Sequence, residues 1–288
     1  MNRIRMMLSV FGFSLLCVLQ ANRSSADEQD WPHWLGTKHD AVWRETGLVS
    51  RFPKEPLEPM WRTPVSGGFS GPTVVGKRVF VTDFVLKTGT SNNLASGSES
   101  VSGQERVLAL DAETGKPLWT HSYPVAYSVS YPSGPRTSPV VHDKRVYTVG
   151  TDGDLLCLSA DDGSVIWSKN FRKDYGVETP FWGHSAHPFV LGDTLVCLVG
   201  ARQAIVVAFD LNNGKERWRA LSGKEPGYAP PTVATFGSKQ TLLVWHPESL
   251  NALNPKDGSL IWSLPMTADY GMSVTAPWSA LVEMVHEK

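Results

Sequence analysis

The fold of this chain is decided by an eleven-residue stretch, ALDAETGKPLW, at residues 109–119. A short apolar run leads into a polar turn that contains a glycine, and a tryptophan follows four residues after that glycine. A repeat period of about 40 to 50 residues is typical of β-propellers, in which each repeat forms one four-stranded blade. The tryptophans that end the four copies of this motif lie 48, 51 and 44 residues apart. Four units carry the matching residues: Asp111, Gly115 and Trp119; Gly163 and Trp167; Asp210, Gly214 and Trp218; Asn254, Gly258 and Trp262.

Each repeat predicts four antiparallel strands. The first two form a hairpin, as in Pro72–Val75 followed by Arg78–Val81, and similar hairpins begin at Pro139, Pro188 and Pro231. Alternating β-branched residues around a short polar turn indicate such a hairpin. The glycine of the later turn supplies a positive φ, and the Asp or Asn before it accepts hydrogen bonds from turn amides. The tryptophan is predicted to pack against the neighbouring blade, so its role is structural.

The two ends of the repeat array do not match each other. The segment Glu58–Thr63 resembles a fourth strand, and Trp61 is predicted to lie in a strand that completes the blade made by the other end of the chain. A fifth unit opens at Gly271 and Pro277 and is not completed. We therefore expect an all-β propeller of about four complete blades in an incomplete ring over residues 57–288, after an N-terminal extension over 27–56. Either the ring closes unusually small, or the chain is a shortened version of a longer propeller, which we favour.

The first 26 residues are predicted to be a secretory signal peptide. Arg3 and Arg5 give a basic start, an apolar run follows from Met6 to Leu19, and small residues end the segment at Ala26. The run is too short for a stable membrane span. The chain has 27 basic and 28 acidic residues, and three of the basic ones lie in this segment, so the mature chain has a formal charge of −4. That charge argues against nucleic acid or an anionic membrane as a partner. The signal peptide predicts export to the periplasm or cell surface.

Two cysteines, Cys157 and Cys197, remain after cleavage. Cys157 stands where the other repeats have Ala109, Ala208 and Ala252, which favours a small buried thiol. A disulfide between the two cysteines is the alternative, since export permits one.

The motif AxDxxxGKxxW, intact at residues 109–119 and 208–218, resembles the tryptophan-docking repeat of PQQ-type propellers. The segments 31–36, 134–136 and 181–185 are similar to exported PQQ-like repeat proteins of planctomycete-type bacteria. The resemblance covers nearly all of the mature chain. The superfamily contains quinoprotein alcohol dehydrogenases and also the non-enzymatic outer-membrane assembly lipoprotein BamB. The resemblance therefore implies a fold and leaves the function open.

A quinone-dependent dehydrogenase is the alternative function, and a non-catalytic protein is the leading hypothesis. The family's dehydrogenases imply a vicinal cysteine pair beside the quinone and a calcium ion with oxygen ligands, and this sequence has no adjacent cysteines. No catalytic or metal-ligating residue can be assigned, and no cofactor is expected; PQQ with calcium belongs only to the dehydrogenase alternative. Residues 183–187 resemble a serine nucleophile motif but end in His187 where glycine is needed. If this segment is extended, His184 and His187 face opposite sides and form no metal site.

A binding site is expected on the connections between blades. These connections lead into the innermost strands, so their ends should surround the mouth of the central channel. Aromatic rings with an arginine are the usual composition of a recognition surface, although the same residues could simply pack the loops onto the blades. The insert over 87–104 is rich in Ser, Gly and Asn and predicts a mobile surface loop. We expect a non-catalytic propeller that binds a protein, peptide or small ligand through four candidate residues: Arg136, Trp182, His184 and Tyr228.

Overall fold

The computed structural model describes residues 30–47, 49–90, 100–236 and 238–277. The predicted signal peptide, the centre of the 87–104 insert and the residues after Pro277 lie outside these described ranges. One short helix, α1 (Phe171–Tyr175), and a 3₁₀ turn at Asp269–Gly271 are the helical elements of the described residues. No helix in these ranges has the length and apolar character needed to cross a membrane.

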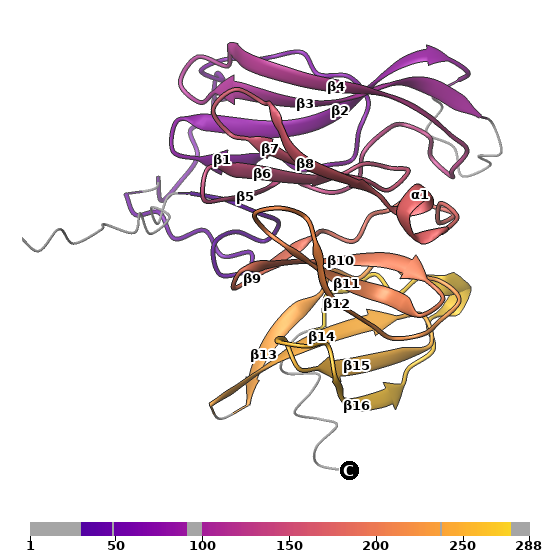
Figure 1. Cartoon of the computed structure of the whole chain (residues 1–288). Coiled ribbons are helices and arrows are strands. Elements are labelled where there is room, and N and C mark those ends of the chain that lie inside the picture. Colours follow the sequence, from indigo (N-terminus) through magenta and orange to yellow (C-terminus); the bar gives the residue numbers. More distant parts are fainter. Residues whose placement is uncertain (1–29, 48, 91–99, 237, 278–288) are drawn as a thin grey trace, which may run out of the picture.

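The described chain forms four four-stranded antiparallel sheets that follow one another along the sequence (Figure 1). Within each sheet the strands lie in chain order, so each repeat makes its own blade. The all-β prediction of four-stranded antiparallel blades is confirmed. The strands of the first sheet are β1 (Thr73–Val75), β2 (Arg78–Thr88), β3 (Val101–Asp111) and β4 (Pro117–Tyr127); of the second β5 (Val140–His142), β6 (Arg145–Val149), β7 (Asp154–Ser159) and β8 (Val165–Asn170); of the third β9 (Phe189–Leu191), β10 (Thr194–Ala201), β11 (Ala204–Asp210) and β12 (Glu216–Ala220); of the fourth β13 (Thr232–Phe236), β14 (Lys239–His246), β15 (Ser249–Leu253) and β16 (Leu260–Pro265).

The first sheet differs from the prediction because its strands are longer. β2 continues to Thr88 and β3 begins at Val101, with Val85 opposite Gln104 in the ladder. Both ends of the 87–104 insert therefore belong to strands, and the prediction of a loop was wrong there. β4 extends to Tyr127, so Tyr123 and Tyr127 both lie in this strand. Backbone pairing between the end of β2 and the start of β3 satisfies the polar groups of these residues, although their composition is typical of a loop.

A tryptophan ring lies on one turn glycine of each sheet, and three of these four contacts join one sheet to the next. A β carbon added to each of these glycines would lie within 2.6 Å of the indole ring. The indole N–H donates to a backbone carbonyl of the same turn, at 2.9–3.2 Å. The tryptophan–glycine pairs run in sequence order: Trp61 on Gly115, Trp119 on Gly163, Trp167 on Gly214 and Trp218 on Gly258.

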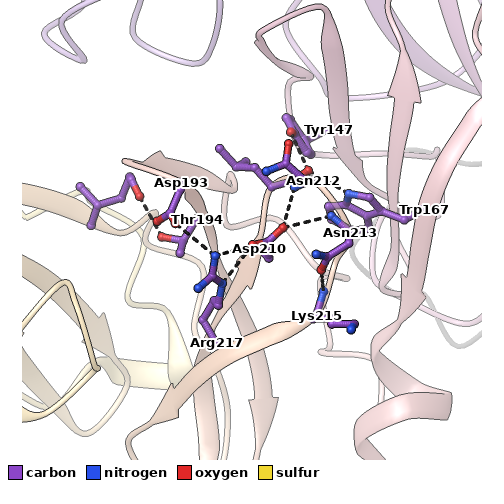
Figure 2. A network of polar contacts seen from close by, with 11 residues as sticks. Tyr147, Trp167, Asp193, Thr194, Asp210, Asn212, Asn213, Lys215 and Arg217 are labelled. Atoms are coloured by element: carbon purple, nitrogen blue, oxygen red, sulfur yellow. Dashed lines mark hydrogen bonds and ion pairs between the residues drawn. The ribbon is translucent and has the colours of Figure 1, made fainter.

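Figure 2 shows this contact at the turn of the third sheet. Trp167 donates its indole N–H to the carbonyl of Leu211 at 2.9 Å, and the Tyr147 hydroxyl donates to the same oxygen. Asp210 accepts hydrogen bonds from two turn amides and from the guanidinium of Arg217. Burial alone would raise the pKa of Asp210, but these hydrogen bonds outweigh it and lower the pKa. The Asp of the repeat thus stabilises the turn on which the tryptophan lies.

A matched pair of glycine substitutions tests this packing. Gly214 and Gly192 have nearly equal positive φ angles of 67° and 60°, but a β carbon at Gly192 meets nothing within 4 Å. Gly192→Ala is expected to lower the free energy of unfolding by about 1 kcal/mol, because the only cost is the strain of a left-handed backbone at a residue with a β carbon. Gly214→Ala should lower the free energy of unfolding by about 2 kcal/mol more than Gly192→Ala does, because its methyl group displaces the Trp167 ring. Chemical unfolding measures both values, and equal costs would contradict the packing role.

Trp61 makes this contact without lying in a strand. Residues 58–63 pair with no strand among the described residues, and the C-terminal residues with which Trp61 was predicted to complete a blade lie outside them, so the closing strand stays a prediction. The ring nevertheless lies on Gly115 of the first sheet, and the nearby Thr63 hydroxyl donates to the Gly115 carbonyl at 2.6 Å. The side chain alone therefore makes the contact that the later tryptophans make from a fourth strand.

The N-terminal segment packs along the first strands of three sheets. Trp31 exchanges two backbone hydrogen bonds with Val74 of β1, and Val141 of β5 donates to the carbonyl of Pro32 at 2.8 Å. Trp34 stacks on His187, just before β9, with ring centroids 4.8 Å apart. The first strands β1, β5 and β9 are also where neighbouring sheets contact each other. In Figure 1 these strands lie on the side of the molecule opposite α1.

The largest hydrophobic cluster lies between the second and third sheets. Tyr147, Phe171 and Phe209 are fully buried in it, together with Cys157 and Cys197. Both thiols are free, which confirms the prediction of buried thiols and excludes the disulfide alternative. Burial raises the pKa of Cys157 to about 11 and raises that of Cys197 further, so both remain protonated and act as small apolar groups.

Candidate functional site

The connections that lead into the four sheets pack against one another and form one continuous surface. Phe69 donates its amide hydrogen to the carbonyl of Pro135, Ser130 to that of Phe181, and Tyr228 to that of Ser273, at 2.8–2.9 Å. These bonds join segments that are far apart in the sequence. We call this the connection surface, made of residues 66–72, 128–139, 176–188, 221–231 and 266–277.

The four candidate binding residues come together on this surface. His184 donates its amide hydrogen to the carbonyl of Thr151, and the Arg136 guanidinium lies 3.4 Å from the hydroxyl of the same threonine. Trp182 precedes Gly183, whose added β carbon would lie 3.3 Å from Arg136 Nε. The Trp182 ring meets Tyr228 edge-on, with centroids 5.5 Å apart.

Arg136 is turned inward and holds its own loop. Its guanidinium donates to the carbonyls of Ser130 and Tyr131 at 2.9 and 2.6 Å, and to that of Gly134. It also lies 5.2 Å from the centroid of the Phe69 ring. Burial lowers the pKa of Arg136 from its usual value, but an arginine side chain stays positively charged in proteins. Arg136 thus positions the loop and the exposed Phe69 ring.

His184 is buried beneath the surface. The residue is 4% exposed, and its ring meets Phe171 of α1 edge-on at 5.2 Å. Its Nε2 atom has no hydrogen-bond partner among the described residues, and burial lowers the pKa to about 4. His187 points elsewhere: it stacks on Trp34 and its Nδ1 accepts the amide hydrogen of Ser138. In the described ranges, no group of three or more His, Cys, Asp or Glu side chains is placed to hold a metal ion.

Aromatic and apolar side chains are the exposed part of the connection surface. Phe181 is 58% exposed and Phe69 is 46% exposed, whereas Tyr228 is buried. Trp182 is half-buried and is held edge-on against Phe181, with centroids 4.8 Å apart. Such rings, fixed by their neighbours, can bury area on a partner with little loss of side-chain freedom.

Glu105 is a residue of this region that the sequence analysis missed. It is fully buried in β3 and accepts hydrogen bonds from the Tyr123 hydroxyl at 2.7 Å and from the Thr151 amide at 3.2 Å. It therefore links the first sheet to Thr151, which contacts both Arg136 and His184. A signal was present, because Glu105 lies in the inward register of β3 together with Val101 and Val107. Treating residues 87–104 as a loop hid that register.

A pH titration tests the burial of Glu105. Burial raises its pKa above the usual value of 4.5, so the folded chain binds a proton more tightly than the unfolded chain. This residue therefore favours the folded state below pH 4.5, and that contribution is lost as the pH rises from 4.5 through the raised pKa. Glu105→Gln keeps the shape and should lose this pH dependence. Unfolding curves at several pH values measure it, with exposed Glu113→Gln as control; parallel curves for wild type and Glu105→Gln would contradict the assignment.

The residues present do not fit the quinone site of the dehydrogenase alternative. The two described cysteines lie on β7 and β10 of different sheets, so neither can form a vicinal pair. The buried carboxyl group of Glu105 is hydrogen-bonded by Tyr123 and Thr151, and within the described ranges no other acidic side chains join it in a calcium-binding set. We therefore derive no reaction step through PQQ.

Four repeats that each form a four-stranded antiparallel sheet, joined by tryptophan–glycine contacts, define a protein of the PQQ-like β-propeller class. Residues 37–126 and 103–277 match the family described as outer membrane protein assembly factor BamB. The chain belongs to this family of PQQ-like repeat proteins.

Individual relatives include dehydrogenases. The chain is 28% identical over 165 residues to quinohemoprotein alcohol dehydrogenase ADH IIB of Pseudomonas putida, a match that covers 55% of this chain and 22% of that protein. It is 26% identical over 136 residues to the dehydrogenase subunit of a quinone alcohol dehydrogenase of Komagataeibacter europaeus, covering 44% and 18%. The structure of quinohemoprotein alcohol dehydrogenase from Comamonas testosteroni matches 85% of this chain and 42% of that one, with 16% identity and a TM-score of 0.52. The chain spans about a fifth of the length of these curated relatives.

Proposed function

We propose that this protein is an exported, non-catalytic β-propeller that binds a partner protein or peptide through its connection surface. The observation that carries the proposal is the exposed pair Phe181 and Phe69, which lie on loops held by backbone hydrogen bonds and by Arg136. Exposed aromatic rings on a rigid base are typical of residues that dominate binding energy at protein interfaces.

Export to the periplasm or cell surface is part of the proposal. The basic and apolar start of the sequence supports it, as does the family's description as an outer membrane protein assembly factor. The formal charge of −4 after removal of that segment argues against a nucleic acid or an anionic membrane as the partner.

Site-specific crosslinking tests the surface. A photoreactive phenylalanine analogue at position 181 should form crosslinks to a discrete partner in cells of the native host. The control is the same analogue at position 261, because Ile261 is 55% exposed on β16 and lies outside the connection surface. Phe181→Ser should weaken binding of the crosslinked partner about tenfold or more, and Ile261→Ser should not. Equal crosslinking at both positions, or none at 181, would overturn the proposal.

The second candidate is a quinone-dependent dehydrogenase, or a remnant of one, and the observation that favours it is the 28% identity to a quinohemoprotein alcohol dehydrogenase. A titration of the mature chain with PQQ, with and without Ca²⁺ and followed by quinone absorbance, separates the two functions. Saturable, calcium-dependent binding of PQQ would contradict the non-catalytic proposal. An unchanged quinone spectrum would contradict the dehydrogenase hypothesis.

A further inference from the structure

A cavity of about 520 Å³ lies between the third and fourth sheets. One side is formed by the end of β12 and the residues after it, and the other by β15, β16 and the turn between them. The polar residues that line it come from both sheets: Ser222, His246, Ser249, Asn251 and Ser263. It shares Leu221 and Ser222 with the connection surface but does not include the exposed Phe69 and Phe181 rings.

Asn251 breaks the pattern of the repeat at this cavity. In the third strand of each sheet, the residue just before the position of Cys157, Ala208 and Ala252 faces the preceding sheet. That residue is Leu156 in the second sheet and Val207 in the third, and both belong to the hydrophobic clusters between sheets. Asn251 occupies the same register in the fourth sheet and is only 2% exposed. The fourth sheet therefore has a buried polar amide at a register where the second and third sheets have aliphatic side chains, although burying a polar group is costly unless it is hydrogen-bonded.

The space is present because no large side chain fills it. Between the first and second sheets, Tyr123 packs against the cluster that contains Leu156. Between the second and third sheets, Tyr175 of α1 packs against the cluster that contains Val207. After β12 the corresponding residues are Leu221, Ser222 and Gly223, and Ser222 lines the cavity.

The polar wall is neutral and is held in place by its own hydrogen bonds. The Ser249 hydroxyl lies 3.0 Å from His246 Nε2, and the Asn251 side-chain amide donates to the same hydroxyl at 3.0 Å. Burial lowers the pKa of His246, so the imidazole is uncharged at neutral pH. The two charged lining residues each have a partner in the protein: Arg219 pairs with Glu216, and Asp257 accepts hydrogen bonds from Ser259.

We propose that this cavity binds a neutral, polyhydroxylated ligand of the size of one sugar unit. The hydroxyls of Ser222, Ser249 and Ser263 can both donate and accept hydrogen bonds, which suits a ring of hydroxyls, and the buried Asn251 and His246 side chains behind them fix the Ser249 hydroxyl. The balanced charge does not favour an anion or a cation. Leu260 and Ala220 supply an apolar wall for the C–H face of the ring. The ligand is either a free monosaccharide or the terminal residue of a glycan.

Ligand-observed NMR on the mature chain tests the proposal. The probes are glucose, galactose, mannose and N-acetylglucosamine, each free and as the terminal unit of a short oligosaccharide. At least one should bind with a dissociation constant of about 1 mM, as expected for a ligand of this size. Tighter binding of an oligosaccharide than of its free sugar identifies a glycan end as the source, and equal binding identifies the free sugar.

Two variants and a matched control locate the binding. Asn251→Leu introduces the residue that the second sheet has at this register, and it should abolish the signal without lowering the unfolding temperature. Ser263→Leu places an aliphatic group in the cavity from an exposed strand position and should weaken binding about tenfold or more. Ser168, the residue after Trp167, matches Ser263, the residue after Trp262, so Ser168→Leu is the control and should leave binding unchanged. The proposal is overturned if no probe binds at 20 mM, a concentration about twentyfold above the expected constant, or if both cavity variants bind as well as wild type.

Discussion

Replacing Trp167 by alanine is expected to lower the free energy of unfolding by about 3–5 kcal/mol. The residue is 8% exposed, lies on Gly214 and belongs to the largest hydrophobic cluster of the molecule. The variant would lose the ring contacts, open a cavity between two sheets and leave the Leu211 carbonyl with the Tyr147 hydroxyl alone. Urea unfolding followed by far-ultraviolet circular dichroism measures the loss.

Trp262 provides the matched control for this substitution. It occupies the same position in the fourth repeat, but it is only half-buried and lies on no turn glycine of the described residues. Trp262→Ala should therefore cost about 1 kcal/mol, in the range of a partly exposed side chain. If both variants lose the same stability, the contact with the following glycine is not what makes the tryptophan important.

Acidification from pH 7 to pH 4 is the second large expected effect. The pKa values of His39, His184 and His187 are each lowered to about 4, mainly by burial. Between the usual value of 6.5 and pH 4, the unfolded chain binds more protons at these residues than the folded chain. Their contribution to stability is complete above pH 6.5 and is lost as the pH falls through 4. Glu105 acts in the opposite direction, because its raised pKa favours the folded state at low pH.

His184 is the clearest test because its ring is buried and its Nε2 has no partner in the described part of the chain. A shift from 6.5 to about 4 corresponds to about 3 kcal/mol. His184→Phe keeps an aromatic ring against Phe171 and should reduce the loss of stability between pH 7 and pH 4 by about that amount. His142→Phe, at a partly exposed site, is the control. Identical pH profiles for wild type and His184→Phe would show that protonation of His184 does not drive acid unfolding.

Features set by local sequence were predicted well. The hairpin of Pro72–Val75 and Arg78–Val81 was predicted with its turn where the structure has it, between Val75 and Arg78, and the turn glycines of the repeats all have positive φ. These follow from alternation of apolar residues and from turn chemistry, which act over a few residues. The small helix α1 was not predicted, although Asn170 caps its start and Gly176 ends it in a left-handed conformation. Five residues are too few to give a helical period in the sequence.

Features that depend on contacts between repeats were predicted less well. The sequence analysis grouped Arg136, Trp182, His184 and Tyr228 correctly in neighbouring connections, but it could not tell which of them face outward. The structure turns Arg136 toward backbone carbonyls and buries His184, leaving Trp182 half-buried and its neighbour Phe181 exposed. The orientation is decided by Thr151 and Glu105, which are distant in sequence and carry no motif.

The segment at Trp31–His39 has a consequence for the order of folding. Its contacts include Val74, Val141 and finally His187 and Phe189, so one short stretch pairs with residues made progressively later. A chain synthesised from its N-terminus makes this segment early, but Trp34 cannot meet His187 until about 150 more residues have been added. Contacts of such long sequence separation are slow to form. The part of the described chain that is made first can therefore reach its final place only after β1, β5 and the start of β9 have come together.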